Sequence, residues 1–325
     1  IHVGTATMPS VLEQAILNLL GRDNTQYVDL PENVLDSFNR HIIHKAETFT
    51  ELLPIVQQAV CEEQKILIVC NRVANAQTIY ELMEEIYPQV DKMLIHSRFR
   101  RKDRNRLEKE LKEVYDKSLH GCIVVSTQVV EVSLDISFDL MITEAAPIDA
   151  LIQRFGRINR RRTTTSVAER KYKPVYVLAP PATRTECLPY SQDVLEQSYK
   201  VLPSNSLLRE VELQKLIDEV YSKVSDVDIS LDAVFVDGKW RLRKLRHLPK
   251  SAFVEKLDID SIACITQEDD ETGRYLNATF EERIQMEIPM RYSSLQWKKL
   301  KQLSVGSQPF VIPDVAYSIE KGVDF

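Results

Sequence analysis

The sequence predicts an α/β protein built on a parallel β-sheet with helices on both faces, followed by a smaller, mixed and β-richer segment. Two patterns predict this fold class. Between residues 49 and 178, short apolar runs alternate with longer stretches of helical period, which is the order of strand and crossover helix in a parallel sheet. After residue 225 the apolar runs are short and separated by turn signals such as Asp237-Gly238, which favours β-structure.

The expected elements begin with a helix over 10–20 that Gly21 ends. Pro147 opens a later helix, and a basic loop follows over 160–165. The remaining strands are expected at 40–44, 65–70, 92–95, 122–125, 140–142, 174–178, 232–236, 261–265, 287–290 and 309–312, and the remaining helices at 49–64, 74–86, 101–115, 191–201 and 207–224.

Polar residues follow four of these strands, at the point where each strand ends. They are Asn71-Arg72, His96 to Arg98, Ser126 to Gln128, and Thr143-Glu144. Ligands bind at the carboxyl ends of the strands in open parallel sheets. Because hydroxyl, amide and guanidinium groups hold phosphate oxygens, we expect a phosphate-binding rim there.

The helix after Pro147 carries a second group of polar side chains. Gln153, Arg157 and Arg160 stand at i, i+4 and i+7, so on a continuous helix they share one face. Such a face presents planar cationic forks suited to phosphate. Arg154 points away from that face and is expected to be structural, paired with an acid in the sheet.

These stretches resemble known motifs. TQVVEVSLD at 127–135 and QRFGRINR at 153–160 are similar to motifs V and VI of superfamily 2 helicases. The longer segments TQVVEVSLDISFD and PIDALIQRFGRINR resemble the CRISPR-associated helicase–nuclease of type I systems. Residues 71–72 and 96–98 resemble motifs IV and IVa, and TATMP at 5–9 resembles motif III.

The resemblance implies a RecA-like helicase lobe of the P-loop NTPase type. Residues 1–38 would then be the tail of a first RecA-like domain with the interdomain linker, and 39–185 the second RecA-like domain. Residues 186–325 would form a helical linker and a small acidic C-terminal subdomain. A chain that opens on Ile1-His2, without Met and in mid-strand, is expected to be a piece of a longer protein.

The resemblance also implies roles for single residues. Arg157 and Arg160 would be arginine fingers, and Gln153 would lie near the γ-phosphate and the attacking water of ATP. Four further residues would serve the nucleotide site, namely Asp135, Glu131, Thr5 and Thr7. The backbone of single-stranded DNA would be gripped by Thr127, Gln128, Asn71, Arg72, His96, Ser97 and Arg98.

Other parts of such a motor are missing from the sequence. There is no GxxxxGK[ST] phosphate loop, because the Gly-Lys pair at Gly238-Lys239 is followed by Trp240, and there is no His-Asp dipeptide of an HD nuclease. ATP and Mg²⁺ are therefore expected to be bound mainly by a first lobe, fused or separate, and this chain alone is expected to be inactive as an ATPase. The resemblance implies 3′-to-5′ travel on single-stranded DNA and recruitment by the CRISPR surveillance complex in antiviral defence.

Bulk properties narrow the class of protein. The net charge of −6 argues against a uniformly basic nucleic-acid binder, but residues 92–173 hold 18 Lys and Arg against 11 Asp and Glu, which suits a local basic surface. The five cysteines are scattered and form no CxxC pair, so neither a disulfide framework nor a cysteine zinc site is expected.

No apolar run reaches the ~18 residues of a membrane helix, so we expect a cytoplasmic protein without membrane contact. His41 and His44 would point to opposite faces of a strand, which argues against a shared metal.

Three other interpretations stay open. The chain resembles, less closely, other superfamily 2 enzymes such as RNA helicases or chromatin-type translocases. It is also compatible with a non-catalytic module that binds nucleic acid or protein, or with a structural subunit, although the latter leaves the Gln153, Arg157 and Arg160 pattern unexplained. The run WRLRKLR at 240–246 fits an exposed strand rim better than a nucleic-acid contact.

Overall fold

The structure is a computed structural model that describes residues 8–22, 26, 30–131, 135–222, 235–236, 239–240, 261–295 and 298–324. These residues belong to two compact units. The first unit contains the chain up to residue 97 and residues 103–222, and the second contains residues 98–102 with the chain from 223 to 323. Among the described residues, no helix combines the length and the apolar character needed to cross a membrane.

The first unit is built on a seven-stranded sheet of order β3-β4-β2-β5-β6-β1-β7. Six strands are parallel, and β7 runs antiparallel to β1 at one edge. The strands are β1 (His41–Ala46), β2 (Lys65–Val69), β3 (Asp91–Ile95), β4 (Cys122–Ser126), β5 (Leu140–Thr143), β6 (Lys173–Leu178) and β7 (Ser206–Leu208).

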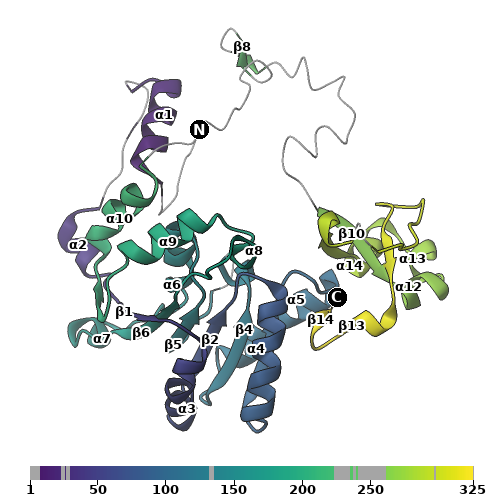
Figure 1. The fold of residues 1–325 in the computed structure, drawn as a ribbon, viewed down its shortest axis with the longest axis horizontal. Coiled ribbons are helices and arrows are strands. Elements are labelled where there is room, and N and C mark those ends of the chain that lie inside the picture. Colours follow the sequence, from purple (N-terminus) through teal and green to yellow (C-terminus); the bar gives the residue numbers. More distant parts are fainter. Residues whose placement is uncertain are drawn as a thin grey trace. The chain divides into compact units, whose positions relative to one another are not determined.

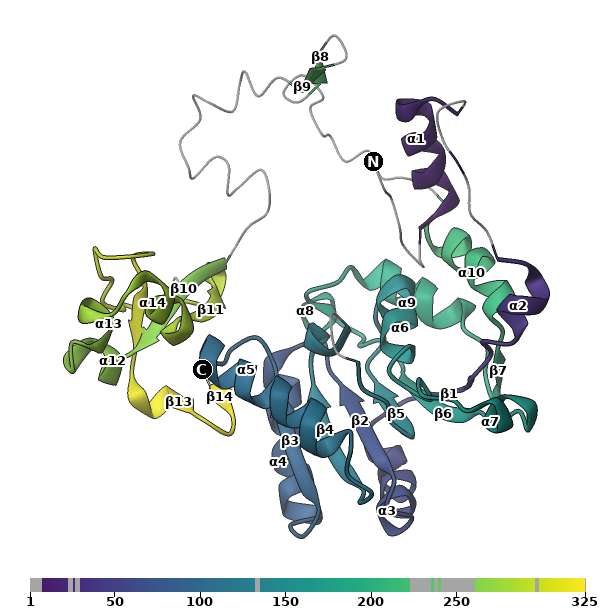
Figure 2. The same ribbon diagram turned by 180° about the vertical axis from the view of Figure 1, so that it is seen from behind.

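Helices cover both faces of this sheet (Figures 1 and 2). On one face, α3 (Leu53–Cys61) and α4 (Val73–Ile86) pack in a core cluster with Ile66, Ile68, Ile123 and other alternate strand residues. The intervening residues Leu67 and Val124 are also fully buried, so the second face is covered as well. The remaining described helices of the unit are α1 (Ser10–Leu20), α2 (Glu32–Asp36), α5 (Arg101–Glu110, whose first two residues belong to the second unit), α6 (Ile148–Phe155), α7 (Thr164–Ala168), α8 (Arg184–Cys187), α9 (Gln192–Val201) and α10 (Leu213–Val220).

The predicted α/β class and parallel sheet are confirmed, and three local predictions are wrong. The helix expected over 207–224 is the short strand β7 followed by α10, because Leu207 pairs with β1. The loop expected over 160–165 contains the start of α7, which Thr163 caps through a bond to the Ser166 amide. The third difference, the end of α6, concerns the candidate site.

The second unit contains a three-stranded sheet of order β11-β10-β12. Its strands are β10 (Ser261–Thr266), β11 (Ile288–Arg291) and β12 (Phe310–Ile312), with the hairpin β13 (Tyr317–Ser318) and β14 (Gly322–Val323). Short helices lie between the strands: α12 (Gln267–Glu271), α13 (Arg274–Asn277) and α14 (Phe280–Met286). The two-residue strands β8 (Phe235–Val236) and β9 (Lys239–Trp240) pair with each other, while the rest of the 240–246 run lies outside the described residues.

Candidate functional site

The polar ends of β2, β4 and β5 meet at one rim, because these strands are neighbours in the sheet. Asn71 lies at the centre of the rim. Its amide donates to the Glu144 carboxylate at 2.6 Å, and its side chain donates to the Ala145 carbonyl at 2.7 Å. Gln128 donates to the Asn71 carbonyl at 2.9 Å. The three strand ends are therefore joined by hydrogen bonds that leave these groups satisfied.

Arg154 of α6 is the residue that closes this rim. Its side chain is 0% exposed. The guanidinium donates to the Glu131 carboxylate at 2.8 Å, to the Thr143 hydroxyl at 2.9 Å, to the Asn71 side-chain oxygen at 2.9 Å and to the Glu144 carbonyl at 3.3 Å. A buried charge is tolerated when it is both paired and hydrogen-bonded. Arg154 thus has the structural role expected from the sequence, with Glu131 as its acid.

Burial is the main influence on the pKa values of Glu131 and Arg157. It raises the pKa of the Glu131 carboxyl above its usual range, although Arg154 acts in the opposite direction. Burial also lowers the pKa of Arg157, and the neighbouring Arg160 lowers it further. Glu131 and Arg157 therefore lie in a partly desolvated environment, where interactions between charges are stronger than in water.

The turn after α6 differs from the prediction. The helix ends at Phe155 and Gly156 caps it, so Gln153, Arg157 and Arg160 do not share a helical face. Ile158 instead forms a β-bridge with Phe138. Burial of this apolar pair and the low helix propensity of glycine favour ending the helix here.

The arginines beyond Phe155 are held against the segment that precedes β5. Arg157 is 9% exposed and donates to the Glu131 carbonyl at 2.7 Å. Arg160, which is exposed, lies 2.8 Å from the Asp135 carboxylate. Gln153 is exposed. Of the predicted nucleotide-site residues, the structure therefore brings Glu131, Asp135, Arg157 and Arg160 together, whereas Thr5 and Thr7 lie outside the described residues.

A buried histidine supports the same turn from β1. His41 Nε2 lies 3.1 Å from the Ile158 carbonyl, so Nε2 carries the hydrogen that it donates. Burial, helped by Arg40, lowers the pKa of His41 to about 3. His44 instead stacks on Tyr176, and among the described residues there is no group of three or more His, Cys, Asp or Glu able to hold a metal ion.

The predicted nucleic-acid residues divide by exposure. Arg72 and Ser97 are exposed, and Arg98 and Gln128 are half-buried. Asn71, His96 and Thr127 are buried. The buried three are enclosed by the structure, whereas the other four expose at least part of their side chains to solvent. The sequence predicts that all seven contact the nucleic acid, because residue type alone does not indicate how deeply a side chain is buried.

Some residues of the site carried no signal in the sequence. The Ser137 hydroxyl accepts from the Arg160 amide at 3.1 Å, and Arg161 forms an ion pair with Asp116. The Tyr190 hydroxyl lies 3.4 Å from Gln128. None of these belongs to a recognisable motif, and each contact joins residues at least 23 positions apart.

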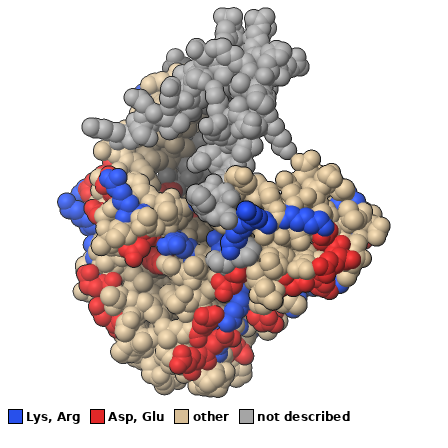
Figure 3. Space-filling view, turned by 45° about the vertical axis from the view of Figure 1, so that its right-hand side comes forward, with Lys and Arg blue, Asp and Glu red and all other residues tan. Residues whose placement is uncertain are grey.

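The face of the molecule in view carries charges of both signs. Figure 3 shows Lys and Arg side chains interspersed with Asp and Glu side chains there. Three of the arginines, Arg100, Arg154 and Arg157, are buried. Part of the positive charge counted in the sequence is therefore internal to the structure.

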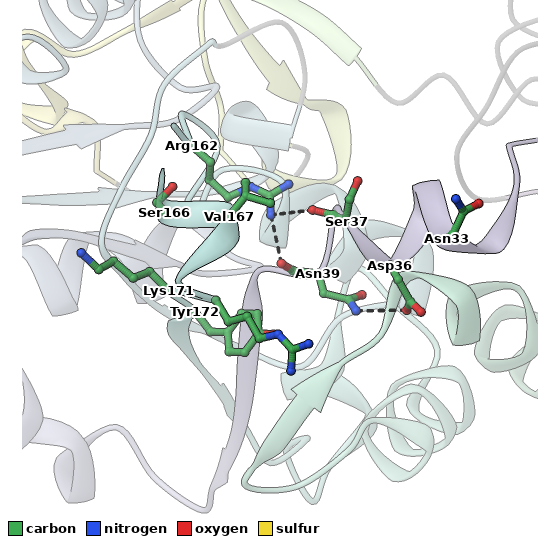
Figure 4. Close-up of a pocket in the computed structure, with 10 residues that line it drawn as sticks. Asn33, Asp36, Ser37, Asn39, Arg162, Ser166, Val167, Lys171 and Tyr172 are labelled. Atoms are coloured by element: carbon green, nitrogen blue, oxygen red, sulfur yellow. Dashed lines mark hydrogen bonds between the residues drawn. The ribbon is translucent and has the colours of Figure 1, made fainter. Parts of the chain in front are cut away.

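A polar pocket of about 250 Å³ lies away from the rim. Asn39 and Tyr172, which line it, precede β1 and β6, so it is at the amino ends of these strands. Arg162 donates to the carbonyls of Ser37 and Asn39 (Figure 4). This contact joins the chain just after residues 153–160 to the chain before β1.

Comparison with known proteins identifies the same part of the chain. Residues 62–163 match the family model described as CRISPR-associated nuclease/helicase Cas3, C-terminal. A CRISPR-associated nuclease/helicase Cas3 of Methanothermobacter thermautotrophicus is 34% identical over 166 residues, which are 50% of this chain and 19% of that protein. The Escherichia coli K12 CRISPR-associated endonuclease/helicase Cas3 is 39% identical over 123 residues, 37% of this chain and 13% of that protein. The resemblance predicted from the sequence is confirmed, and the chain spans about a fifth or less of the length of these two relatives.

Solved structures show the same fold. The crystal structure of T. fusca Cas3 superposes with a TM-score of 0.65 at 19% identity, covering 94% of this chain and 44% of that one. A structure titled crystal structure of CRISPR-associated protein gives a TM-score of 0.68 at 18% identity, covering 92% and 42%. At these identities the likeness establishes the fold alone.

Two arginines of the turn provide a matched test of burial. We expect Arg154→Ala to lower the free energy of unfolding by about 3–5 kcal/mol, because it leaves Glu131 buried and unpaired. Arg160→Ala removes an exposed ion pair and should cost about 0–1 kcal/mol. Urea denaturation of both variants measures the difference, and equal losses would show that the Arg154 network contributes no more than a surface contact.

His41 should make stability depend on pH. Its folded pKa of about 3 lies below the ordinary 6.5, so between these values the unfolded chain binds a proton that the folded chain excludes. Stability should then fall as pH drops below about 6.5, by up to about 1.4 kcal/mol per pH unit from this group. His41→Phe should flatten that dependence in denaturation curves from pH 7 to pH 4. A slope unchanged by the substitution would contradict the buried, neutral histidine.

Proposed function

Because residues 62–163 resemble the C-terminal helicase region of Cas3, we propose that this chain is the second RecA-like lobe of an ATP-dependent single-stranded DNA translocase of CRISPR type I interference. It supplies arginine fingers and a phosphate-backbone track, and a P-loop lobe supplies the rest of the ATPase. The chain alone is inactive as an ATPase. Since it spans only part of its relatives, this function is that of a larger protein or complex.

The observation that carries this proposal is the set of hydrogen bonds and ion pairs that join residues 127–135 to residues 153–160. Arg154 binds the Glu131 carboxylate, Arg157 binds the Glu131 carbonyl, and Arg160 binds Asp135. In a motor, a change at the bound nucleotide has to alter the contacts with the nucleic acid. Residues joined by such bonds move together and can couple the two sites. The same network ends at Gln128 and Asn71 on the rim.

The exposed side chains of the turn fit a nucleotide. Arg160 and Gln153 face solvent, and the planar guanidinium of Arg160 can bridge two phosphate oxygens. Asp135 holds Arg160 until a phosphate competes for it, so this pair reports the state of the nucleotide. Arg157 must turn from the Glu131 carbonyl to reach a phosphate. ATP, when bound with Mg²⁺ by the first lobe, supplies the free energy for movement.

The exposed part of the rim fits a nucleic-acid backbone. Arg72 and Ser97 are exposed and Gln128 is half-buried, each shortly after a strand of the seven-stranded sheet. Arg98, which belongs to the second unit, is half-buried. Contacts from arginine and hydroxyl groups to phosphate carry no sequence information. A track of this kind suits movement along single-stranded DNA of any sequence, and the 3′-to-5′ direction is proposed from the resemblance alone.

The proposed function also implies partners for this chain. An HD nuclease domain and the P-loop lobe would lie in the same polypeptide or in separate subunits. A solved structure of similar fold is titled CRISPR RNA-guided surveillance complex, pre-nicking, with a TM-score of 0.58 at 19% identity over 94% of this chain and 46% of that one. We propose that this chain likewise works with a surveillance complex, in the cytoplasm.

The finger assignment predicts a loss of turnover. In a protein reconstituted with a P-loop lobe, Arg157→Ala or Arg160→Ala should lower ATP hydrolysis by about 10³–10⁵-fold, because transition-state charge is no longer stabilised. Single-strand binding should remain. Arg170→Ala is the control, since Arg170 lines the pocket near the amino ends of the strands, away from the turn. Hydrolysis that continues undiminished in both finger variants would remove the assignment.

The track predicts a change in salt dependence. Arg72→Ala should reduce the slope of log affinity for single-stranded DNA against log salt by about 0.7, the value for one lost phosphate contact. Arg170→Ala, at the pocket near the amino ends of the strands, should leave the slope unchanged. Fluorescence anisotropy across a salt series measures both. If the two variants behave alike, the track lies elsewhere.

A further inference from the structure

Tyr190 lies at the rim although it belongs to none of the segments that were expected to form it. It stands between α8 and α9, in the chain that follows the carboxyl end of β6. Because β6 is parallel to its neighbour β5, the chain leaves both strands at the same edge of the sheet. The Tyr190 hydroxyl accepts from the Gln128 side chain at 3.4 Å, and Gln128 also donates to the Asn71 carbonyl at 2.9 Å. Two hydrogen bonds therefore connect Tyr190 to the ends of β4 and β2.

The hydrogen of the Tyr190 hydroxyl has no acceptor in the described part of the chain. A phenol hydroxyl both accepts and donates, and the contact with Gln128 uses it as an acceptor. Burial raises the pKa of Tyr190, and the charge of Arg154 and the hydrogen bond from Gln128 act in the opposite direction. The raised pKa means that the hydroxyl keeps its hydrogen at neutral pH. Tyr190 and Gln128 are both half-buried, so this pair is partly open to solvent.

Other tyrosines of the same unit use their hydroxyl hydrogen internally. Tyr221 donates to the Asp149 carboxylate, and Tyr115 donates to the Lys92 carbonyl at 3.0 Å. Polar groups that are largely buried normally find partners of this kind. The unused donor of Tyr190 is therefore an exception at the one place where the sheet edge presents groups suited to phosphate.

The acceptor that suits this donor is a phosphate oxygen. Tyrosine hydroxyls are among the groups that proteins use to contact the backbone of nucleic acids. Arg72, which is exposed, directly follows Asn71, so a cationic side chain starts next to the residue that Gln128 binds. All of these residues belong to the first unit.

We propose that Tyr190 is a further contact of the nucleic-acid track, and that its hydroxyl donates to a phosphate oxygen of the single strand. Gln128 holds the hydroxyl as an acceptor and leaves its hydrogen for the ligand. The proposal rests on the proposed function, because it adds a residue to the same track. It also gives the track a neutral contact, whose effect on binding differs from that of an arginine.

The first experiment removes only the hydroxyl. An oligo-dT single strand is titrated with the 325-residue chain across a salt series, by fluorescence anisotropy. Tyr190→Phe should weaken binding by about tenfold at every salt concentration, because a hydrogen bond to a charged group is lost. The slope of log affinity against log salt should stay unchanged, because this slope reports the phosphates neutralised by Lys and Arg. Unchanged affinity overturns the proposal, and so does a slope that falls as it should in Arg72→Ala.

Tyr190→Leu separates the hydroxyl from the ring. Aromatic rings also bind single strands by stacking on bases, and such a contact would survive in Tyr190→Phe but not in Tyr190→Leu. We expect both variants to bind more weakly than the unchanged chain. If Tyr190→Leu loses affinity while Tyr190→Phe binds normally, the ring contacts a base and the phosphate contact is wrong.

Tyr115→Phe is the matched control. It removes the hydroxyl of another tyrosine of the same unit, one that binds Lys92 near the amino end of β3, the edge of the sheet opposite to the rim. Its affinity for oligo-dT should equal that of the unchanged chain. A loss equal to that of Tyr190→Phe would show that any missing hydroxyl weakens binding through the stability of the unit, and the proposal fails.

Photo-crosslinking distinguishes a contact from an indirect effect through Gln128. Tyr190→p-azidophenylalanine is irradiated with enough oligo-dT to saturate the variant, and Tyr115→p-azidophenylalanine is treated alike. A crosslink to the strand is expected from position 190 and none from position 115. A bound strand that forms no crosslink with position 190 overturns the direct contact.

These outcomes separate the Tyr190 contact from the function on which it rests. If Arg72→Ala lowers the salt slope and Tyr190→Phe binds normally, the track stands and the Tyr190 contact is wrong. If the unchanged chain binds no oligo-dT, the track itself is wrong and the Tyr190 contact falls with it.

Discussion

The structure of the candidate site depends on one enclosed guanidinium. Arg154 reaches from α6 to the ends of β2 and β5 and to Glu131 after β4. An arginine keeps its charge, so once enclosed it must be given acceptors on every side. This requirement fixes the positions of three strand ends and one helix relative to one another.

The neighbouring groups follow from that constraint. With Glu131 held by Arg154, its carbonyl is placed to accept from Arg157. The turn that carries Arg157 is in turn held by the Phe138–Ile158 bridge and by His41. The outermost residues, which include Gln153, Asp135, Arg160 and Arg161, remain exposed. The site thus has an internal layer that sets geometry and an external layer that is available for ligands.

The sequence predicted the sheet and its rim because both depend on local patterns. Apolar runs mark buried parallel strands whatever surrounds them, and polar residues at their ends must lie at one edge. The end of α6 was missed because the spacing of Gln153, Arg157 and Arg160 suits a helix, while the competing bridge to Phe138 is a tertiary contact. The burial of Thr127 and His96 was not predicted for the same reason, because elements distant in sequence cover these side chains. The capture of residues 98–102 by a unit that begins more than a hundred residues later has no local signal.

The most direct test of this account is a double-mutant cycle between Arg154 and Glu131. Unfolding free energies are measured for Arg154→Met, Glu131→Gln and the combined variant. The account predicts a coupling free energy of about 1–3 kcal/mol, because the double variant removes both charges together and leaves neither ion buried alone. Additive losses would mean that the two side chains are independent, and the shared support of the rim and the arginine turn would have to be abandoned.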